Sequence, residues 1–195
     1  MTGTAASGPV VAPQVGTMIV ASAVSGRLIS RTGRWKVFPV VGCALVTAGA
    51  VLLSPLAPDT PGWWLAGAMA VLGAGTGLTQ QVLVLVAQNA VGPADVGTAG
   101  AAATFSRTLG GAVGVAAFGA MLSARLRAGL PPGQDPGELL GTPEKVAALP
   151  GHLADTVRAS YTAGLSSVFL LTVPLALAAL VAVLLLRETP LGTRG

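Results

Sequence analysis

The first candidate functional residues are a cluster of cations in a short turn between two apolar stretches. Four of the eleven residues from 26 to 36 are basic, and the residues of interest are Gly26, Arg27, Arg31, Gly33, Arg34 and Lys36. Cations are favoured beside a helix C-terminus by its dipole and beside a membrane by anionic headgroups, and glycine permits positive φ. Two roles fit: the cations only fix which side of a membrane the turn faces, or they form a cytoplasmic latch on a neighbouring helix.

Four side-chain amides lie in a later apolar stretch. Gln80 and Gln81 stand near its middle, and Gln88 and Asn89 stand at its end. An amide surrounded by lipid must find hydrogen-bond partners. We therefore expect Gln80 and Gln81 either to line a substrate path or to bond between helices, and Gln88 and Asn89 to cap the cytoplasmic exit.

A single cation, Arg107, interrupts the next apolar stretch. It lies about nine residues into the stretch, roughly 14 Å at 1.5 Å per residue, and so approaches the middle of a membrane. A charge at that depth costs at least about 2.5 kcal/mol. Arg107 therefore either needs a partner and has a functional role, or its side chain snorkels to the inner interface.

The acidic residues all lie outside the apolar stretches: Asp59, Asp95, Asp135, Glu138, Glu144, Asp155 and Glu188. Proton coupling normally uses an acid within the membrane, so this chain offers no candidate proton carrier. The single Cys43 and single His152 have no acidic cluster near them in sequence. We expect no metal site, no cofactor and no enzymatic activity.

Two pairs of glycines have the spacing of helix-packing motifs: Gly73 with Gly77, and Gly110 with Gly114. Small residues four apart let helix backbones approach each other in lipid, which offers little hydrophobic drive for association. The glycines at 73, 75 and 77 do not follow a strand and lack the dinucleotide-binding spacing. Close helix packing is the interpretation that we favour.

The composition indicates an integral membrane protein. Charged residues make up 9% of the chain and hydrophobic residues 52%, whereas soluble domains carry about 25% charged residues. The net charge of +4 is spread over short loops, and aromatics make up only 4%. This distribution does not fit a nucleic-acid-binding surface, and the expected environment is the lipid bilayer.

Crossing a hydrocarbon core takes roughly 20 apolar residues, and on that basis the chain forms a single all-α membrane domain. Five spans are predicted, at 10–26, 37–56, 63–86, 98–122 and 160–186. The charged, proline-rich segment 123–159 is predicted to be an external loop. The chain starts without the positively charged segment of a secretory signal.

Basic residues also predict the orientation. The turn at 27–36 and the tail with Arg187 and Arg194 are separated by four spans and so lie on the same side. The positive-inside bias makes that side cytoplasmic. The N-terminus is therefore expected outside and the C-terminus in the cytoplasm, in the inner (plasma) membrane.

These strings together resemble the major facilitator superfamily. The basic turn is similar to the loop that joins the second and third helices of each six-helix half, and the downstream strings are similar to the fourteen-helix drug:proton antiporter branch. The strings are Gly26-x-Leu28-x-x-Arg31-x-Gly33-Arg34-x-Lys36, Gly73-x-Gly75-x-Gly77-x-x-Gln80-Gln81, Gln88-Asn89-x-Val91, Gly97-x-Ala99 and Arg107-x-x-Gly110-Gly111-x-x-Gly114. The family loop has an aspartate where this chain has Ser30. The family's antiporter motif and coupling acids, mostly in the N-terminal half, have no counterpart here.

The resemblance implies most of the C-terminal half of a major facilitator fold, with five transmembrane helices. Such halves place the substrate site between repeats, so this chain supplies one wall. The implied function is proton-coupled efflux of a small amphipathic compound, with an N-terminal transporter half as partner, encoded in the same gene or on a separate chain. The chain is expected to be inactive alone. The alternative is a non-transporting membrane assembly partner or a truncated gene product.

Overall fold

The chain forms a bundle of long helices. The computed structural model describes residues 8–55, 57, 59–129 and 151–186. Its helices are α1 (Gly8–Thr32), α2 (Val37–Leu53), α3 (Gly62–Asn89), α4 (Val96–Gly129) and α7 (Gly151–Leu185). Within these ranges no strand occurs, and the all-α fold class predicted for a polytopic membrane protein is confirmed.

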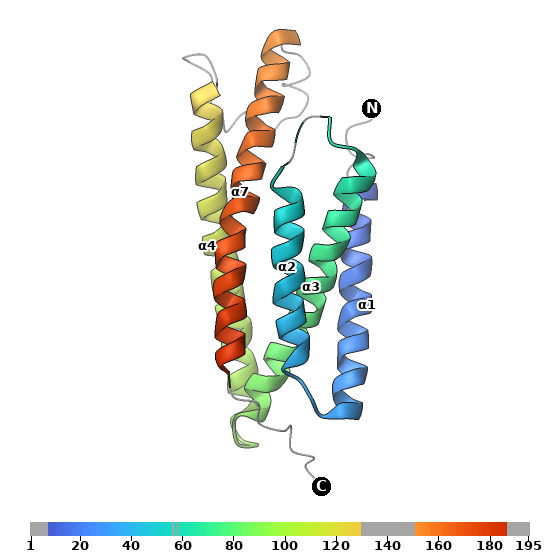
Figure 1. Cartoon of the computed structure of the whole chain (residues 1–195). Helices are drawn as coiled ribbons and strands as arrows, with labels where there is room; N and C mark the ends of the chain where they lie inside the picture. Colours follow the sequence, from blue (N-terminus) through green and yellow to red (C-terminus); the bar gives the residue numbers. More distant parts are fainter. Residues whose placement is uncertain (1–7, 56, 58, 130–150, 187–195) are drawn as a thin grey trace.

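Helix α3 is the centre of the bundle. It packs against α1, α2 and α4, while α7 packs against α2 and α4. Figure 1 shows the result: α1, α2 and α3 stand together, and α4 and α7 form a pair beside them. The turn at residues 33–36, the loop at 90–95 and the end of α7 all lie at one end of the bundle, which we call the basic end.

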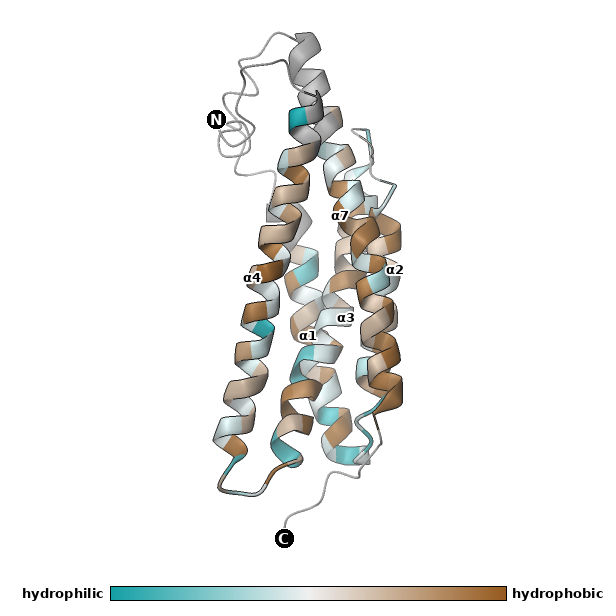
Figure 2. Cartoon of the chain, turned by 90° about the vertical axis from the view of Figure 1, so that its left-hand side faces the viewer, coloured by the Kyte–Doolittle hydropathy of each residue, from teal (hydrophilic) through white to brown (hydrophobic). Residues whose placement is uncertain are grey.

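The lengths of the helices match a membrane environment in part. Three of the helices are long and apolar enough to cross a membrane: Gly62–Asn89, the part of α4 at Val96–Ala124 and the part of α7 at Tyr161–Leu185. Helix α2 is a shorter apolar helix. In Figure 2 hydrophobic residues run along the helices, and hydrophilic residues gather at the basic end. The two remaining predicted spans, 10–26 and 37–56, stay predictions.

Helices α4 and α7 extend beyond the predicted spans into the segment 123–159. α4 continues to Gly129 and α7 begins at Gly151. A helix of this length rises about 50 Å, which exceeds a hydrocarbon core of about 30 Å, so its ends need not coincide with the ends of the apolar stretch. The rest of the predicted external loop, 130–150, lies outside the described residues, as does the tail from 187.

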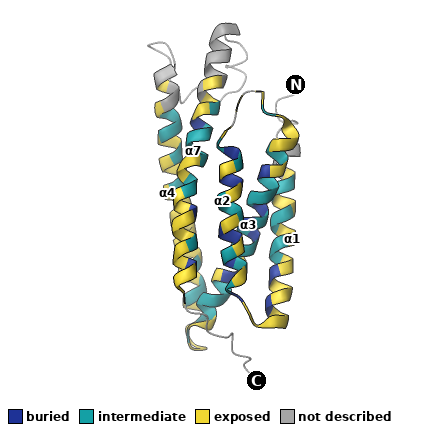
Figure 3. Ribbon diagram, viewed as in Figure 1, coloured by how far each residue is buried: buried dark blue, intermediate teal, exposed yellow. Residues whose placement is uncertain are grey.

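Glycines on opposite sides of α3 let two neighbouring helices approach it closely. A Cβ at Gly73 would collide with the Gln14 carbonyl of α1, and one at Gly77 would collide with the Met18 carbonyl. A Cβ at Gly75 would lie 2.7 Å from the Gly42 carbonyl oxygen of α2. Successive helical residues are rotated by about 100°, so Gly75 faces away from the other two. In Figure 3 the buried residues concentrate on α2 and α3.

The basic turn ends α1 by a glycine cap. Gly33 has φ +67°, and its N–H donates to the Ile29 carbonyl at 2.9 Å. This single bond from the residue after the helix is the αL capping motif, which favours glycine because it has no Cβ. The turn then returns to the bundle through Trp35, which is 1% exposed and packs with Ile29 and Val82. The chain between α1 and α2 is thereby held against α3.

Candidate functional site: a groove beside α1 and α3

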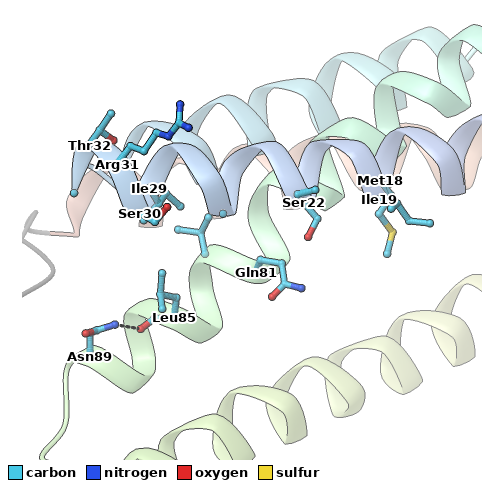
Figure 4. A pocket seen from close by; sticks show the side chains of 14 residues that line it. Met18, Ile19, Ser22, Ile29, Ser30, Arg31, Thr32, Gln81, Leu85 and Asn89 are labelled. Carbon is cyan, nitrogen blue, oxygen red and sulfur yellow. Dashed lines mark hydrogen bonds between the residues drawn. The ribbon is translucent and has the colours of Figure 1, made fainter. Parts of the chain in front are cut away.

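A groove of about 1120 Å³ opens along α1 and α3 toward the basic end. It is lined by α1, the turn that follows it and the last two and a half turns of α3. The lining includes Met18, Ser22, Gly26, Arg31, Gly33, Gln81, Leu85 and Asn89. Figure 4 shows Ser22 and Gln81 projecting into the same space from α1 and α3, and no described residue of α4 lines it. Sites for drug-sized ligands are about 300–1,000 Å³, so the groove can accept one.

The lining combines apolar surface with a few polar groups. Met18, Ile19 and Leu85 supply apolar contacts, and the Gln81 amide is exposed in the groove. Asn89 donates from Nδ2 to the Leu85 carbonyl at 2.9 Å and so folds back on its own helix at the end of α3. Such a surface suits an amphipathic molecule, because the apolar wall binds its body and scattered polar groups orient it.

The four amides divide between two faces of α3. Gln81 and Asn89, eight residues apart, line the groove. Gln88 faces α4, since a Cβ at Gly100 would lie 2.8 Å from its Nε2. Gln80, eight residues before Gln88, faces α4 as well.

Gln80 and Arg107 form a hydrogen bond between helices. Arg107 Nη1 of α4 donates to Gln80 Oε1 of α3 at 3.2 Å. Gln80 is half-buried and Arg107 is exposed. From the sequence, Gln80 was expected to line a substrate path or to bond between helices, and Arg107 to find a partner or to snorkel; the structure brings these two side chains together. A neutral acceptor is a weaker partner for a guanidinium than a carboxylate is.

The basic turn also contacts the last turn of α7. Lys36 Nζ donates to the Leu184 carbonyl at 2.9 Å. The last carbonyls of a helix lack intrahelical partners and carry its negative partial charge, so this ammonium caps α7. Arg27, Arg31 and Arg34 are exposed. Ser30, where the family loop has an aspartate, donates to the Arg27 carbonyl at 2.8 Å.

The glycine pair of α4 behaves unlike the pair of α3. A Cβ at Gly110 or Gly114 would meet nothing within 4 Å, so no described helix packs on them. Figure 3 shows α4 exposed over much of its length. Among the described side chains, no three of His, Cys, Asp and Glu come together.

Two contacts of the α1–α3 interface were not predicted from the sequence. Trp35 is buried although it stands in a charged turn. Thr17 donates to the Ala70 carbonyl of α3 at 2.9 Å and to the Pro13 carbonyl of its own helix at 2.8 Å. The available signal was the tryptophan itself, because Trp side chains are highly buried on average.

Comparison with known proteins decides the family. The model of the Major Facilitator Superfamily matches residues 1–115, more than half of the chain. The chain belongs to the Major Facilitator Superfamily. The resemblance inferred from the basic turn and the downstream strings is thereby confirmed. Membership also supports a multi-pass membrane protein.

The relatives are named as transporters and efflux pumps. An MFS-type transporter of Mycobacterium tuberculosis is 38% identical over 190 residues, which is 95% of this chain and 28% of the relative. The efflux pump aunC of Aspergillus niger is 31% identical over 184 residues, 91% of this chain and 35% of the relative. The multidrug transporter protein MdtP of Bacillus subtilis is 30% identical over 119 residues, 61% of this chain and 22% of the relative.

The chain therefore spans about a third or less of the length of these relatives. No solved structure matches it significantly.

Proposed function

We propose that the chain is the C-terminal part of a proton-coupled multidrug efflux transporter of the Major Facilitator Superfamily, and that it does not transport alone. The observation that carries the proposal is the one-sided groove. Described helices form its wall along α1 and α3, and the relatives are about three times as long as this chain. In such transporters the substrate site lies between repeats. The remaining wall then belongs to the rest of the transporter.

The distribution of acids supports the second half of the proposal. Of the described acids, Asp59 and Asp95 lie between helices at opposite ends of the bundle, and Asp155 lies in α7 before its apolar part. The three helices that are long and apolar enough to cross a membrane contain no carboxylate in their apolar parts. A proton carrier at membrane depth is an acid in most coupled transporters. The coupling carboxylate is therefore assigned to the rest of the transporter.

Dye efflux from vesicles with an imposed pH gradient tests this proposal. The chain alone should give no gradient-dependent efflux. The chain together with the part of the M. tuberculosis relative that precedes the matched segment should restore it. Efflux by the chain alone would contradict the proposal, and Asp95 would then be the first acid to replace. Stable membrane insertion with no efflux in either arrangement would favour the non-transporting assembly partner.

The proposal includes an orientation in the inner (plasma) membrane, with the N-terminus outside and the C-terminus in the cytoplasm. It rests on the cations of the turn, since a cluster of Lys and Arg marks a cytoplasmic loop. The contact between Lys36 and Leu184 is consistent with it, because the turn and the end of α7 lie at the same end of the bundle. Reporter fusions at Pro58, Asp95 and Gly141 should read outside, inside and outside. A cytoplasmic reading at Gly141 would exclude this topology.

A further inference from the structure

Helix α4 presents a cation near the middle of its apolar part, and within the described part of the chain no carboxylate pairs with it. The apolar part runs over Val96–Ala124, and Arg107 lies three residues from its centre, about 4.5 Å along the axis. Its guanidinium is exposed and donates to the neutral Gln80 Oε1. A guanidinium has five N–H donors. A membrane-depth cation with one neutral acceptor calls for an anionic partner.

The open glycines lie on the same face of α4 as this cation. At about 100° per residue, Gly111 is about 40° from Arg107 and Gly114 about 20° from it. Added Cβ atoms at Gly110, Gly111 and Gly114 would meet nothing within 4 Å. Toward the start of α4, in contrast, the same face contacts α3 through Gly100 and Gln88. This face of α4 is thus covered by α3 on the N-terminal side of Arg107 and open on the C-terminal side.

A second copy of this chain does not satisfy the cation. The apolar parts of α3, α4 and α7 contain no Asp or Glu. The seven acids stand outside all five predicted spans. A homodimer packed through the glycines of α4 would therefore bring together two unpaired arginines, which repel each other most strongly where the dielectric constant is low.

We propose that the α4 face formed by Arg107, Gly110, Gly111 and Gly114 docks a transmembrane helix from the rest of the transporter, and that this helix carries an aspartate or glutamate at the depth of Arg107. The charge of Arg107 specifies the acid, and the open glycines admit a closely packed backbone. Gln80 then positions the guanidinium from the α3 side. This inference rests on the proposed function, because it needs the part of the transporter outside this chain.

Co-purification tests the docking. The tagged chain is expressed with the part of the M. tuberculosis relative that precedes the matched segment, and the amount captured in mild detergent is measured. Arg107→Lys should retain capture, whereas Arg107→Leu should lower it by at least about tenfold, because the acid of the partner is then left unpaired in lipid. Arg127→Leu is the matched control, because this exposed cation of α4 lies beyond the apolar part.

A charge swap separates docking from misfolding. The chain with Arg107→Glu should lose capture, and changing each membrane-depth Asp or Glu of the partner to Arg in turn should restore it at one position. Restoration shows that the variant folds. If no position restores capture, or if Arg107→Leu leaves it unchanged, the inference is overturned. If the unchanged chain captures nothing, the proposed function itself fails, so the two failures are distinguishable.

The glycine face gives an independent measurement. Gly110→Leu and Gly114→Leu should each lower capture, because a large side chain holds the docked helix away. Gly119→Leu is the control: it is equally open but lies about 120° around the helix from Arg107. Equal losses at all three positions would contradict a specific face.

Discussion

The interface between α1 and α3 and the exposed length of α4 contain the same sequence motif in two environments. At Gly73 and Gly77 the backbone of α1 occupies the space that a side chain would need, whereas Gly110 and Gly114 border open space. About 22% of the most apolar part of α3 is buried, and none of that part of α4 is. Both helices are apolar enough to span a membrane.

The difference shows that a small-residue motif contributes to helix packing only where another helix lies against it. In addition to the glycines of α3, Thr17 forms a hydrogen bond across the α1–α3 interface, and the buried Trp35 packs at its end. Along α4 the hydroxyls of Thr104 and Thr108 bond within their own helix. The chain thus has a completed interface and an incomplete one. Four predictions test that contrast, from the largest expected effect to the smallest.

The largest effect is expected at the end of the completed interface. Trp35→Ala should destabilise the chain by about 3–5 kcal/mol, because it empties a fully enclosed site beside Ile29 and Val82. Phe105→Ala on α4 should change the stability by less than about 0.5 kcal/mol, since this ring is 67% exposed. Denaturant titration of both variants in mixed micelles measures the difference. Similar losses would mean that the two regions do not differ in packing.

The glycine pairs should respond in opposite directions to the same change. Gly73→Ala and Gly77→Ala should each cost about 1–3 kcal/mol, because the new methyl group meets backbone atoms of α1 that cannot yield freely. Gly110→Ala and Gly114→Ala should be neutral or stabilise by about 0.5–1 kcal/mol, since alanine favours a helix over glycine. The same titration compares the four variants. A cost at Gly110 equal to that at Gly73 would show that α4 already packs against another helix.

The hydroxyl groups should show a smaller contrast. Thr17→Val removes the bond to the Ala70 carbonyl and should cost about 0.6–1.7 kcal/mol, the range found for hydrogen bonds between membrane helices. Thr108→Val removes a bond within α4 and should cost less than about 0.5 kcal/mol. Unfolding measured by tryptophan fluorescence distinguishes the two. An equal cost would place the stabilising role of Thr17 within its own helix.

The smallest effect is expected where the two regions are linked through the turn. Lys36→Met removes the cation that caps α7 at Leu184 and should cost about 0.3–1 kcal/mol, visible as faster hydrogen exchange in the last turn of α7. Arg34→Met is the control, because this exposed cation donates from its backbone to Thr32 instead. Unchanged hydrogen exchange in the Lys36 variant would show that Lys36 does not stabilise α7 and only helps to fix the orientation of the turn in the membrane.

The sequence by itself determined the class of protein. Few charges, long apolar stretches and the positions of the proline and glycine breakers were enough to predict an all-α membrane fold, because lipid admits only helices and closed barrels. The basic turn and the downstream strings were enough for the family. That Arg107 must either find a partner or snorkel to the interface also followed from the sequence, since a charge in the hydrocarbon region of a membrane is costly.

The tertiary structure decided which partners meet. It alone paired Arg107 with Gln80 and Lys36 with the end of α7, because these contacts join residues 27 and 148 positions apart. It also separated two glycine pairs that are identical as patterns, since a motif four residues long specifies a helix face but not the helix opposite. The burial of Trp35 also depends on the tertiary structure. The glycine cap at Gly33 redirects the chain onto α3, and Trp35 becomes buried only once α1 and α3 have packed.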